Sequence, residues 1–152
     1  MSNTRSIREA EYGDAPAISA LIRKCLRQTL AAHYSQAHID QQYEVWSEAH
    51  IRRLMQWPER CMLVATRNEI VGTACLFKDS VRKLFVDPNF EGKGIGRCLM
   101  GRIEQVAIGR GLAMLTVQSS VNAAGFYRKL GYRFVGEKEV QGEPFILLQK
   151  SL

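Results

Sequence analysis

The most informative part of the chain is residues 81–111, which read VRKLFVDPNFEGKGIGRCLMGRIEQVAIGRG. The apolar stretch at residues 81–86 predicts a strand, and the Asp-Pro pair that follows ends it. A loop with glycine at every second position lies at residues 92–96 and opens directly into a segment with helical periodicity. This order predicts a strand, a glycine loop and a helix that begins at the loop.

The glycine loop has the features of a phosphate-binding loop. Small residues at a helix start leave several backbone N–H groups unpaired and pointing in one direction, and the helix dipole adds partial positive charge there. Lys93 and Arg97 add formal positive charge. We therefore expect residues 92–97 to hold a phosphate or pyrophosphate group.

The spacing of the loop excludes two common nucleotide-binding motifs. A P-loop needs an earlier glycine before the Gly-Lys pair and a Ser or Thr after the lysine, and both are missing around Lys93. A dinucleotide fingerprint needs a third glycine, but Arg97 or Leu99 stands at that position in the two possible alignments. A simple strand-to-helix turn stays open as the alternative for the loop alone.

The loop resembles the acyl-CoA pyrophosphate loop of the GNAT superfamily of N-acetyltransferases. That loop is usually written Q/R-x-x-G-x-G/A. Gly94 and Gly96 match the glycine positions, whereas Glu91 stands where the family usually carries Arg or Gln.

A second segment resembles a later motif of the same superfamily. It contains Asn122, the Phe126-Tyr127 pair and a following Gly-Tyr pair. Two motifs in the expected order, with a strand pattern between them, are more specific than either one alone. The clear resemblance covers residues 62–136, and the chain is identified from it as a member of the GNAT superfamily.

The hydrophobic periodicity along the rest of the chain predicts the other helices and strands. The expected elements are a strand at 4–10, a helix from Asp14 to about 31, a polar and aromatic stretch at 32–40, a second helical region to Trp57, a hairpin of strands 61–67 and 70–78, a strand at 80–87, a helix from Gly94 to about Arg110, a strand at 113–118, a helix at 121–130, and strands at 132–137 and 144–150. This order predicts an α/β fold, a mixed and mostly antiparallel central sheet with helices on both faces, in one domain over residues 1–152.

Composition limits the function classes. The 152 residues carry a net charge of +6, which suits an anionic ligand such as coenzyme A. The basic residues are scattered and no nucleic-acid-binding motif is present, so we expect no nucleic-acid partner. The longest apolar run is too short for a membrane span, and the start lacks the apolar region of a secretion signal. The four cysteines lack metal-ligand spacing, so we expect buried thiols in the cytoplasm and no metal.

The resemblance also implies where acetyl-CoA binds as the acetyl donor. The pantetheine arm is expected to pair with the strand at residues 84–86, with the thioester carbonyl near the N–H of Phe85 or Val86. The expected cofactor-binding residues are Leu84, Phe85, Val86, Glu91, Gly92, Lys93, Gly94, Ile95, Gly96, Arg97, Asn122 and Tyr127.

Tyr127 matches the family tyrosine near the CoA sulfur. Its hydroxyl is protonated at neutral pH, so it could give a proton to the departing thiolate. The alternative is a tyrosine that only packs. Asn122 is expected to bind the arm of the cofactor, or else to cap the helix that begins there.

The general base is not assigned by the sequence. Asp79 is one candidate, although a residue before a strand is commonly a solvated turn residue. His33 and His38 lie between the first two helices, a segment that borders the acceptor pocket in this family, whereas His50 lies outside it.

The expected activity is N-acetylation of a primary amine, either a small molecule or a peptide, by direct transfer. Acceptor specificity is expected in residues 32–46, and a homodimer is possible. One rival hypothesis is a non-catalytic CoA-binding sensor or regulatory module, and a weaker one is a basic nucleic-acid-binding domain.

Overall fold

The computed structural model describes residues 6–152, so the first two residues of the expected opening strand lie outside the described part. The elements are β1 (Ser6–Glu9), η1 (Tyr12–Asp14), α1 (Ala15–Gln28), η2 (Leu30–Ala32), α2 (Gln36–Val45), α3 (Glu48–Met55), β2 (Arg60–Arg67), β3 (Glu69–Phe77), β4 (Ser80–Val86), η3 (Pro88–Phe90), α4 (Ile95–Gly109), β5 (Met114–Ser119), α5 (Ala124–Lys129), β6 (Arg133–Val140) and β7 (Glu143–Ser151).

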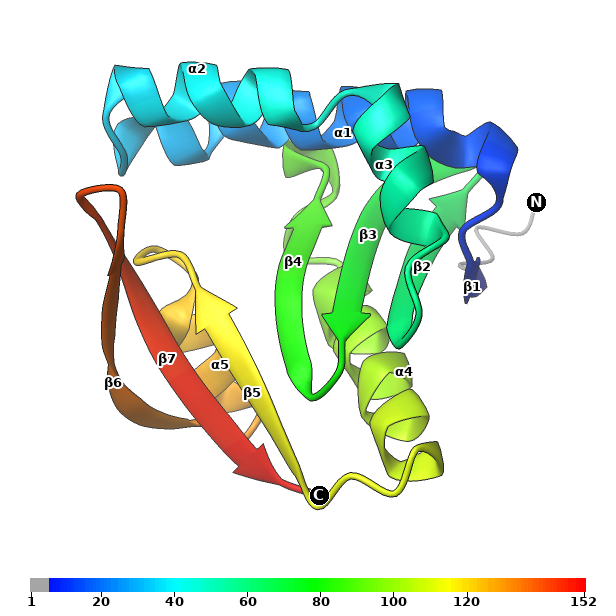
Figure 1. Ribbon diagram of the computed structural model, residues 1–152, viewed down its shortest axis with the longest axis vertical. Coiled ribbons are helices and arrows are strands. Elements are labelled where there is room, and N and C mark those ends of the chain that lie inside the picture. The colour runs from blue at the N-terminus through cyan, green and yellow to red at the C-terminus, as the bar shows by residue number, and fades with distance from the viewer. Residues whose placement is uncertain (1–5) are drawn as a thin grey trace.

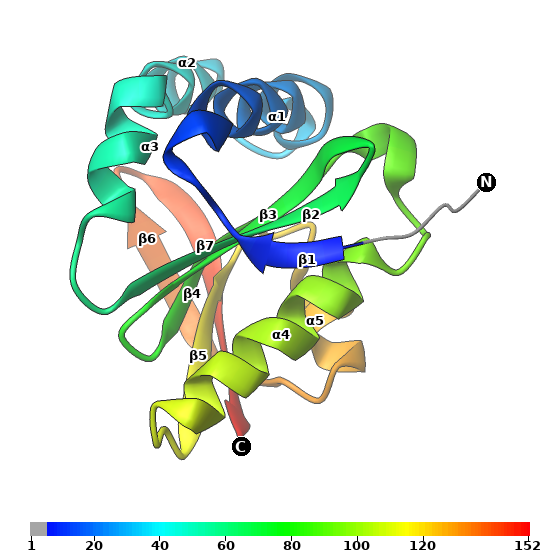
Figure 2. The ribbon, with the colours of Figure 1, turned by 90° about the vertical axis from the view of Figure 1, so that its right-hand side faces the viewer.

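These strands form one seven-stranded sheet in the order β1-β2-β3-β4-β5-β7-β6 (Figure 1). Every neighbouring pair is antiparallel except β4 and β5, which are parallel. Helices α1, α2 and α3 cover one face of the sheet, and α4 lies against the other (Figure 2). The predicted fold class is therefore confirmed.

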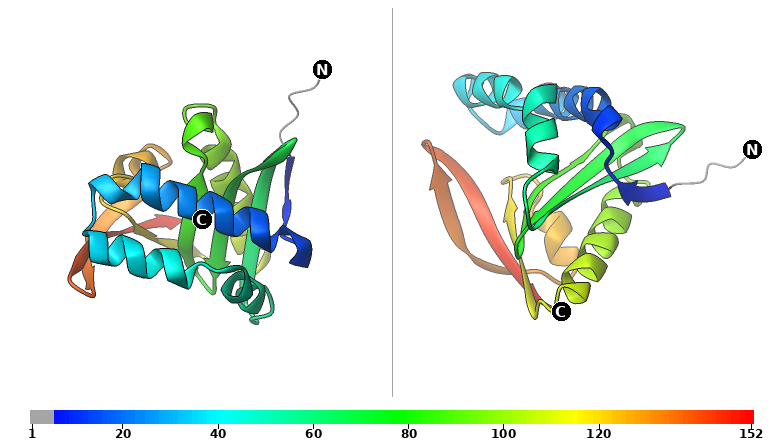
Figure 3. Two further views of the ribbon diagram at one scale, coloured as in Figure 1. Left: turned by 90° about the horizontal axis from the view of Figure 1, so that it is seen from above. Right: turned by 45° about the vertical axis from the view of Figure 1, so that its right-hand side comes forward.

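The sheet divides between β4 and β5. These two strands pair only at Ser80 with Thr116 and at Val81 with Val117, close to the start of β4. Beyond that point they diverge, and the sheet opens into the wedge seen in Figure 1 and in the right panel of Figure 3. As a result, one edge of β4 has no strand beside it from Arg82 onward.

A bulge in β4 lies at the point where the two strands separate. Consecutive residues of β3 pair with Lys83 and with Val81, so Arg82 between them has no partner on β3. One extra residue moves every later side chain to the opposite face of the sheet. Accordingly, Val81 packs in the core under α4, whereas Phe85, four residues further on, packs in the core under α1.

Each face of the sheet has its own hydrophobic core. The core under α4 includes Ile95, Leu99 and Ile103 of that helix, together with Leu115 and Leu148 of the sheet, all of them buried. The first turn of α4 approaches β3 closely at Gly72, where a Cβ atom would lie 3.0 Å from side-chain atoms of both Ile95 and Leu99. Gly72 thus fixes the place at which α4 starts on the sheet.

Three local expectations differ from the structure. The second helical region is two helices, because the chain breaks at Trp46 and the Ser47 side chain caps α3 by accepting from the His50 N–H at 3.2 Å. Helix α5 is shorter than expected and begins at Ala124. The expectation of buried thiols is wrong for Cys98, which is exposed on α4.

Candidate functional site

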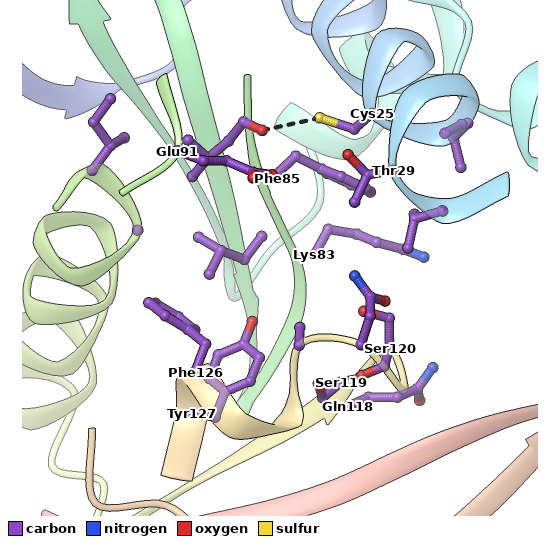
Figure 4. A pocket seen from close by; sticks show the side chains of 18 of the residues that line it. Cys25, Thr29, Lys83, Phe85, Glu91, Gln118, Ser119, Ser120, Phe126 and Tyr127 are labelled. Atoms are coloured by element: carbon purple, nitrogen blue, oxygen red, sulfur yellow. Dashed lines mark hydrogen bonds between the residues drawn. The ribbon is translucent and has the colours of Figure 1, made fainter. Parts of the chain in front are cut away.

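A pocket of about 730 Å³ lies between the diverging strands β4 and β5. Its walls come from α1, the exposed edge of β4, the loop before α4, the end of β5 and α5 (Figure 4), together with α2 and Phe145 of β7. All the residues expected to bind the cofactor line this pocket except Lys93. The pocket has two ends, which we call the loop end (residues 91–97) and the far end (beneath α2).

The loop end has the backbone conformation that an anion site requires. Gly92 and Gly94 have φ angles of +74° and +80°, a region in which side-chain-bearing residues are strained. Gly94 is also the N-cap of α4, so the first N–H groups of the helix have no acceptor within the helix, and residues 94–97 line the pocket. The first turn of α4 contains no acidic residue and includes Arg97, which favours an anion.

The loop is held from two directions. Asp87, which is buried, forms a salt bridge of 2.8 Å with Lys24 of α1 and accepts a hydrogen bond of 2.9 Å from the Asn89 N–H. On the other side, a Cβ atom on Gly96 would lie 3.0 Å from the ring of Phe126. Gly96 is therefore required for the contact of α4 with α5, in addition to any approach of a ligand.

The exposed edge of β4 offers backbone groups to the pocket. The Asp87 N–H donates to Val71 O of β3 at 2.8 Å. In an antiparallel pair, successive residues of a strand direct their N–H groups alternately toward the partner strand and away from it. The Phe85 N–H is therefore directed to β3, and the Val86 N–H is directed away from it. The thiol of Cys25 on α1 donates to Val86 O at 3.3 Å, so the carbonyl of Val86 is also directed away from β3. Of the two candidate N–H groups, Val86 carries the one that faces the pocket.

Tyr127 is buried on α5, and its hydroxyl points into the pocket (Figure 4). Its ring packs against the rings of Phe126 and Tyr132, with centroids 5.1 and 5.9 Å away. Burial raises the pKa of Tyr127, so its hydroxyl is protonated throughout the neutral range. The side chain thus faces the pocket in its protonated form.

Three further expected residues lie at the rim. Asn122 is exposed and lines the pocket, and α5 has no side-chain cap, so the alternative role of Asn122 as a cap is not observed. Glu91 is exposed and also lines the pocket. Lys93 lies outside the lining, with its ammonium 5.7 Å from the centroid of the Phe90 ring.

The far end is formed by segments that are distant in the sequence. Tyr34 donates a hydrogen bond of 3.0 Å to Pro144 O and accepts one of 3.0 Å from the Val121 N–H. Its ring stacks on Phe145 with centroids 5.3 Å apart, and the ring of His38 lies 5.2 Å from it. Tyr34 therefore ties three parts of the chain together where they close the pocket.

Of the four candidate bases, only His38 lines the pocket. Burial lowers the pKa of His38, which favours its neutral form, and its buried Nδ1 has no hydrogen-bond partner among the described residues. Asp79 and His33 are exposed, and His50 packs edge-on against the ring of Trp46.

Lys83 is a pocket residue that the sequence analysis did not identify. Its side chain extends from β4 away from Phe126 and Tyr127, toward the helices drawn in blue and cyan in Figure 4. The bulge at Arg82 places Lys83 on this face. The only signal in the sequence is the Arg82-Lys83 pair, which interrupts an otherwise apolar strand.

Within residues 6–152, no three His, Cys, Asp or Glu side chains come together in a way that could hold a metal ion. In the same part of the chain, no helix combines the length and apolar character needed to cross a membrane.

Comparisons with known proteins place the chain in a family. A family model of the acetyltransferase (GNAT) domain matches residues 30–152. The peptidyl-lysine N-acetyltransferase YjaB from Salmonella typhimurium is 34% identical over 95 residues, which cover 60% of this chain and 64% of that protein. The chain thus spans less than two thirds of the length of this relative.

Two solved structures share the whole fold. A GCN5-related N-acetyltransferase from Rhodopseudomonas palustris superposes with a TM-score of 0.83 at 31% identity, over 100% of this chain and 98% of that one. PaiA N-acetyltransferase from Thermoplasma acidophilum, solved in complex with coenzyme A, gives a TM-score of 0.84 at 19% identity, over 98% of this chain and 99% of that one. The chain belongs to the GNAT acetyltransferase family.

Proposed function

We propose that this protein transfers an acetyl group from acetyl-CoA directly to a primary amine, with Tyr127 as the general acid. The observation that carries the proposal is the arrangement of one pocket. It joins the exposed edge of β4, the hydroxyl of Tyr127 and a glycine loop at the start of a helix. Residues 1–152 form one catalytic domain in this proposal.

Acetyl-CoA fits the pocket as the donor substrate. A pantetheine arm can pair with the exposed edge of β4 at residues 84–86 as an added strand, and a pyrophosphate can accept from the N–H groups at residues 92–97. Arg97 and Lys93 add positive charge at this end. Support also comes from PaiA, which shares the fold and was solved with coenzyme A.

The reaction requires one bond to form and one to break. The nitrogen of the amine attacks the thioester carbonyl carbon, the C–N bond forms, and the C–S bond breaks. In this proposal the Val86 N–H donates to the carbonyl oxygen as negative charge develops there. Tyr127 gives its proton to the departing sulfur, and solvent returns a proton to Tyr127 after release. The proton lost by the amine goes to water or to a base that is not yet assigned.

A lysine side chain of a peptide is the first acceptor class to test, because the relative YjaB is named for it. A small-molecule amine is the second. We also place the reaction in a reducing, cytoplasmic environment, since Cys25, Cys61 and Cys75 are buried thiols.

The test is release of CoA thiol from acetyl-CoA with a panel of peptide and small amines. The Tyr127→Phe variant should lower kcat by on the order of 10² and leave the Kd of acetyl-CoA nearly unchanged, because only the transferable proton is removed. Tyr12→Phe is the matched control, since Tyr12 is exposed, packs beside Arg52, lies outside the pocket lining, and should keep wild-type turnover.

The pH profile gives a second check. Because burial raises the pKa of Tyr127, its deprotonation should cause no loss of activity below the ordinary tyrosine pKa of about 10.

Wild-type turnover in Tyr127→Phe would show that water protonates the thiolate. Binding of acetyl-CoA without thiol release for any amine would instead support the non-catalytic CoA-binding module.

A further inference from the structure

The charged groups of the pocket are distributed unevenly. Among the residues that line it, Glu91 is the only acid, and it belongs to the loop end. The lining also contains Arg82 and Lys83 of β4, of which Lys83 extends toward the helices at the far end (Figure 4), and no carboxylate besides Glu91. A pocket that received a purely cationic amine would be expected to carry acids at this end.

Lys83 has no anionic partner in the described part of the chain. Its ammonium lies 5.6 Å from the centroid of the Trp46 ring, and it forms no salt bridge with residues 6–152. Glu143 contributes to the electrostatics of His38, and its Oε1 accepts hydrogen bonds from the N–H and the hydroxyl of Ser35.

This environment is costly for a positive charge. Burial, and then the neighbouring Arg82, lower the pKa of Lys83. An anion beside the ammonium would offset both effects and hold Lys83 in its charged form. The bulge at Arg82 is what turns Lys83 from the core under α4 into this position, so the placement follows from the backbone and is not a chance side-chain rotamer.

Given the acetyl transfer proposed above, we infer that the amine acceptor carries a carboxylate close to its amine and that Lys83 pairs with this carboxylate. The positive groups of the pocket would repel an acceptor that is only an ammonium, whereas a carboxylate-bearing amine enters with little net charge. The same positive charge in the pocket favours deprotonation of the amine, and the neutral amine is the form that attacks the thioester. An amino acid and a peptide lysine beside an acidic residue both provide this chemistry.

The test compares matched acceptor pairs in the thiol-release assay. One arm uses amino acids and their carboxamides, and the other uses lysine peptides that differ only by Asp or Asn next to the lysine. The carboxylate member of a pair should have the higher kcat/KM, by on the order of 10- to 100-fold, mainly through KM, because a charge-assisted hydrogen bond is involved. The arm that shows the larger preference identifies the source of the carboxylate.

Variants of Lys83 assign the preference to this residue. Lys83→Met should abolish it and leave the Kd of acetyl-CoA unchanged, whereas Lys83→Arg should retain it. Lys138→Met, an exposed lysine on β6 outside the pocket lining, is the control and should keep the wild-type preference. An unchanged thermal shift with acetyl-CoA confirms that each variant is folded.

Equal use of both members of every pair by the wild type would overturn the inference, as would a preference that survives in Lys83→Met. A fall in kcat for all acceptors alike in Lys83→Met would also overturn it, because that result assigns Lys83 to proton transfer. Absence of thiol release with every amine would instead show that the proposed function itself is wrong.

Discussion

The two ends of the pocket are built in different ways. The loop end consists of seven consecutive residues, 91–97, and what it offers a ligand is mostly backbone N–H groups fixed by two glycines in the left-handed region. The far end brings together side chains from separate segments, with Tyr34, Lys83 and Phe145 as its main parts. One end therefore depends on backbone conformation, and the other depends on side-chain identity.

This difference has a consequence for function. Backbone groups recognise a chemical feature that every acetyl-CoA molecule presents, so the loop end suits a constant donor. Side chains can change one at a time without altering the fold, so the far end suits an acceptor that varies among proteins of this architecture. Substitutions at the two ends should then affect different kinetic constants.

The largest effect of this kind is expected at Gly94. Gly94→Ala should weaken acetyl-CoA binding by on the order of tenfold or more, because alanine at a φ of +80° is strained by about 1–2 kcal/mol and the loop must shift to relieve it. The KM of the amine should change little. Calorimetric titration with acetyl-CoA and steady-state kinetics measure the two quantities.

Gly101→Ala is the matched control for this prediction. Gly101 lies within α4, and a Cβ atom added to it would have nothing within 4 Å, so alanine should leave the Kd unchanged and stabilise the helix by about 0.5–1 kcal/mol. Equal losses of donor and acceptor affinity in Gly94→Ala would contradict the separation of the two ends.

A smaller effect is expected at Glu91, which places a negative charge at the loop end. If its carboxylate lies about 6 Å from the pyrophosphate, the repulsion in water is about 0.7 kcal/mol, so Glu91→Gln should tighten acetyl-CoA binding about threefold. The gain should be larger at low salt than at high salt. Titrations at two ionic strengths decide this, and an affinity that stays the same at both would show that Glu91 points into solvent.

The sequence was sufficient where the structural cause is local. The glycine loop, the helix α4 and the hairpin of β2 and β3 are set by the residues within each segment, and the structure has all three. The start of α1 at Asp14, followed by proline, was predicted for the same reason. The fold class followed from the order of such segments.

The parts that the sequence did not show arise from tertiary contacts. The bulge at Arg82 follows from how β4 pairs with β3 and leaves β5, and alternation within the strand alone assigns Lys83 to the opposite face. The role of Gly96 becomes clear only when Phe126 is packed against it. Tyr34 lies in the stretch where acceptor specificity is expected and lines the pocket, but the sequence did not show that its hydroxyl bonds to Pro144 and Val121.

The central claim is that the loop end and the exposed edge of β4 together form a site for acetyl-CoA. The most direct measurement is a calorimetric titration of the wild-type protein with acetyl-CoA in the absence of any amine. We predict saturable binding of one molecule per chain, with stabilisation of about 3 kcal/mol when the ligand is present at roughly 200 times its Kd. Absence of binding at millimolar acetyl-CoA would contradict the account.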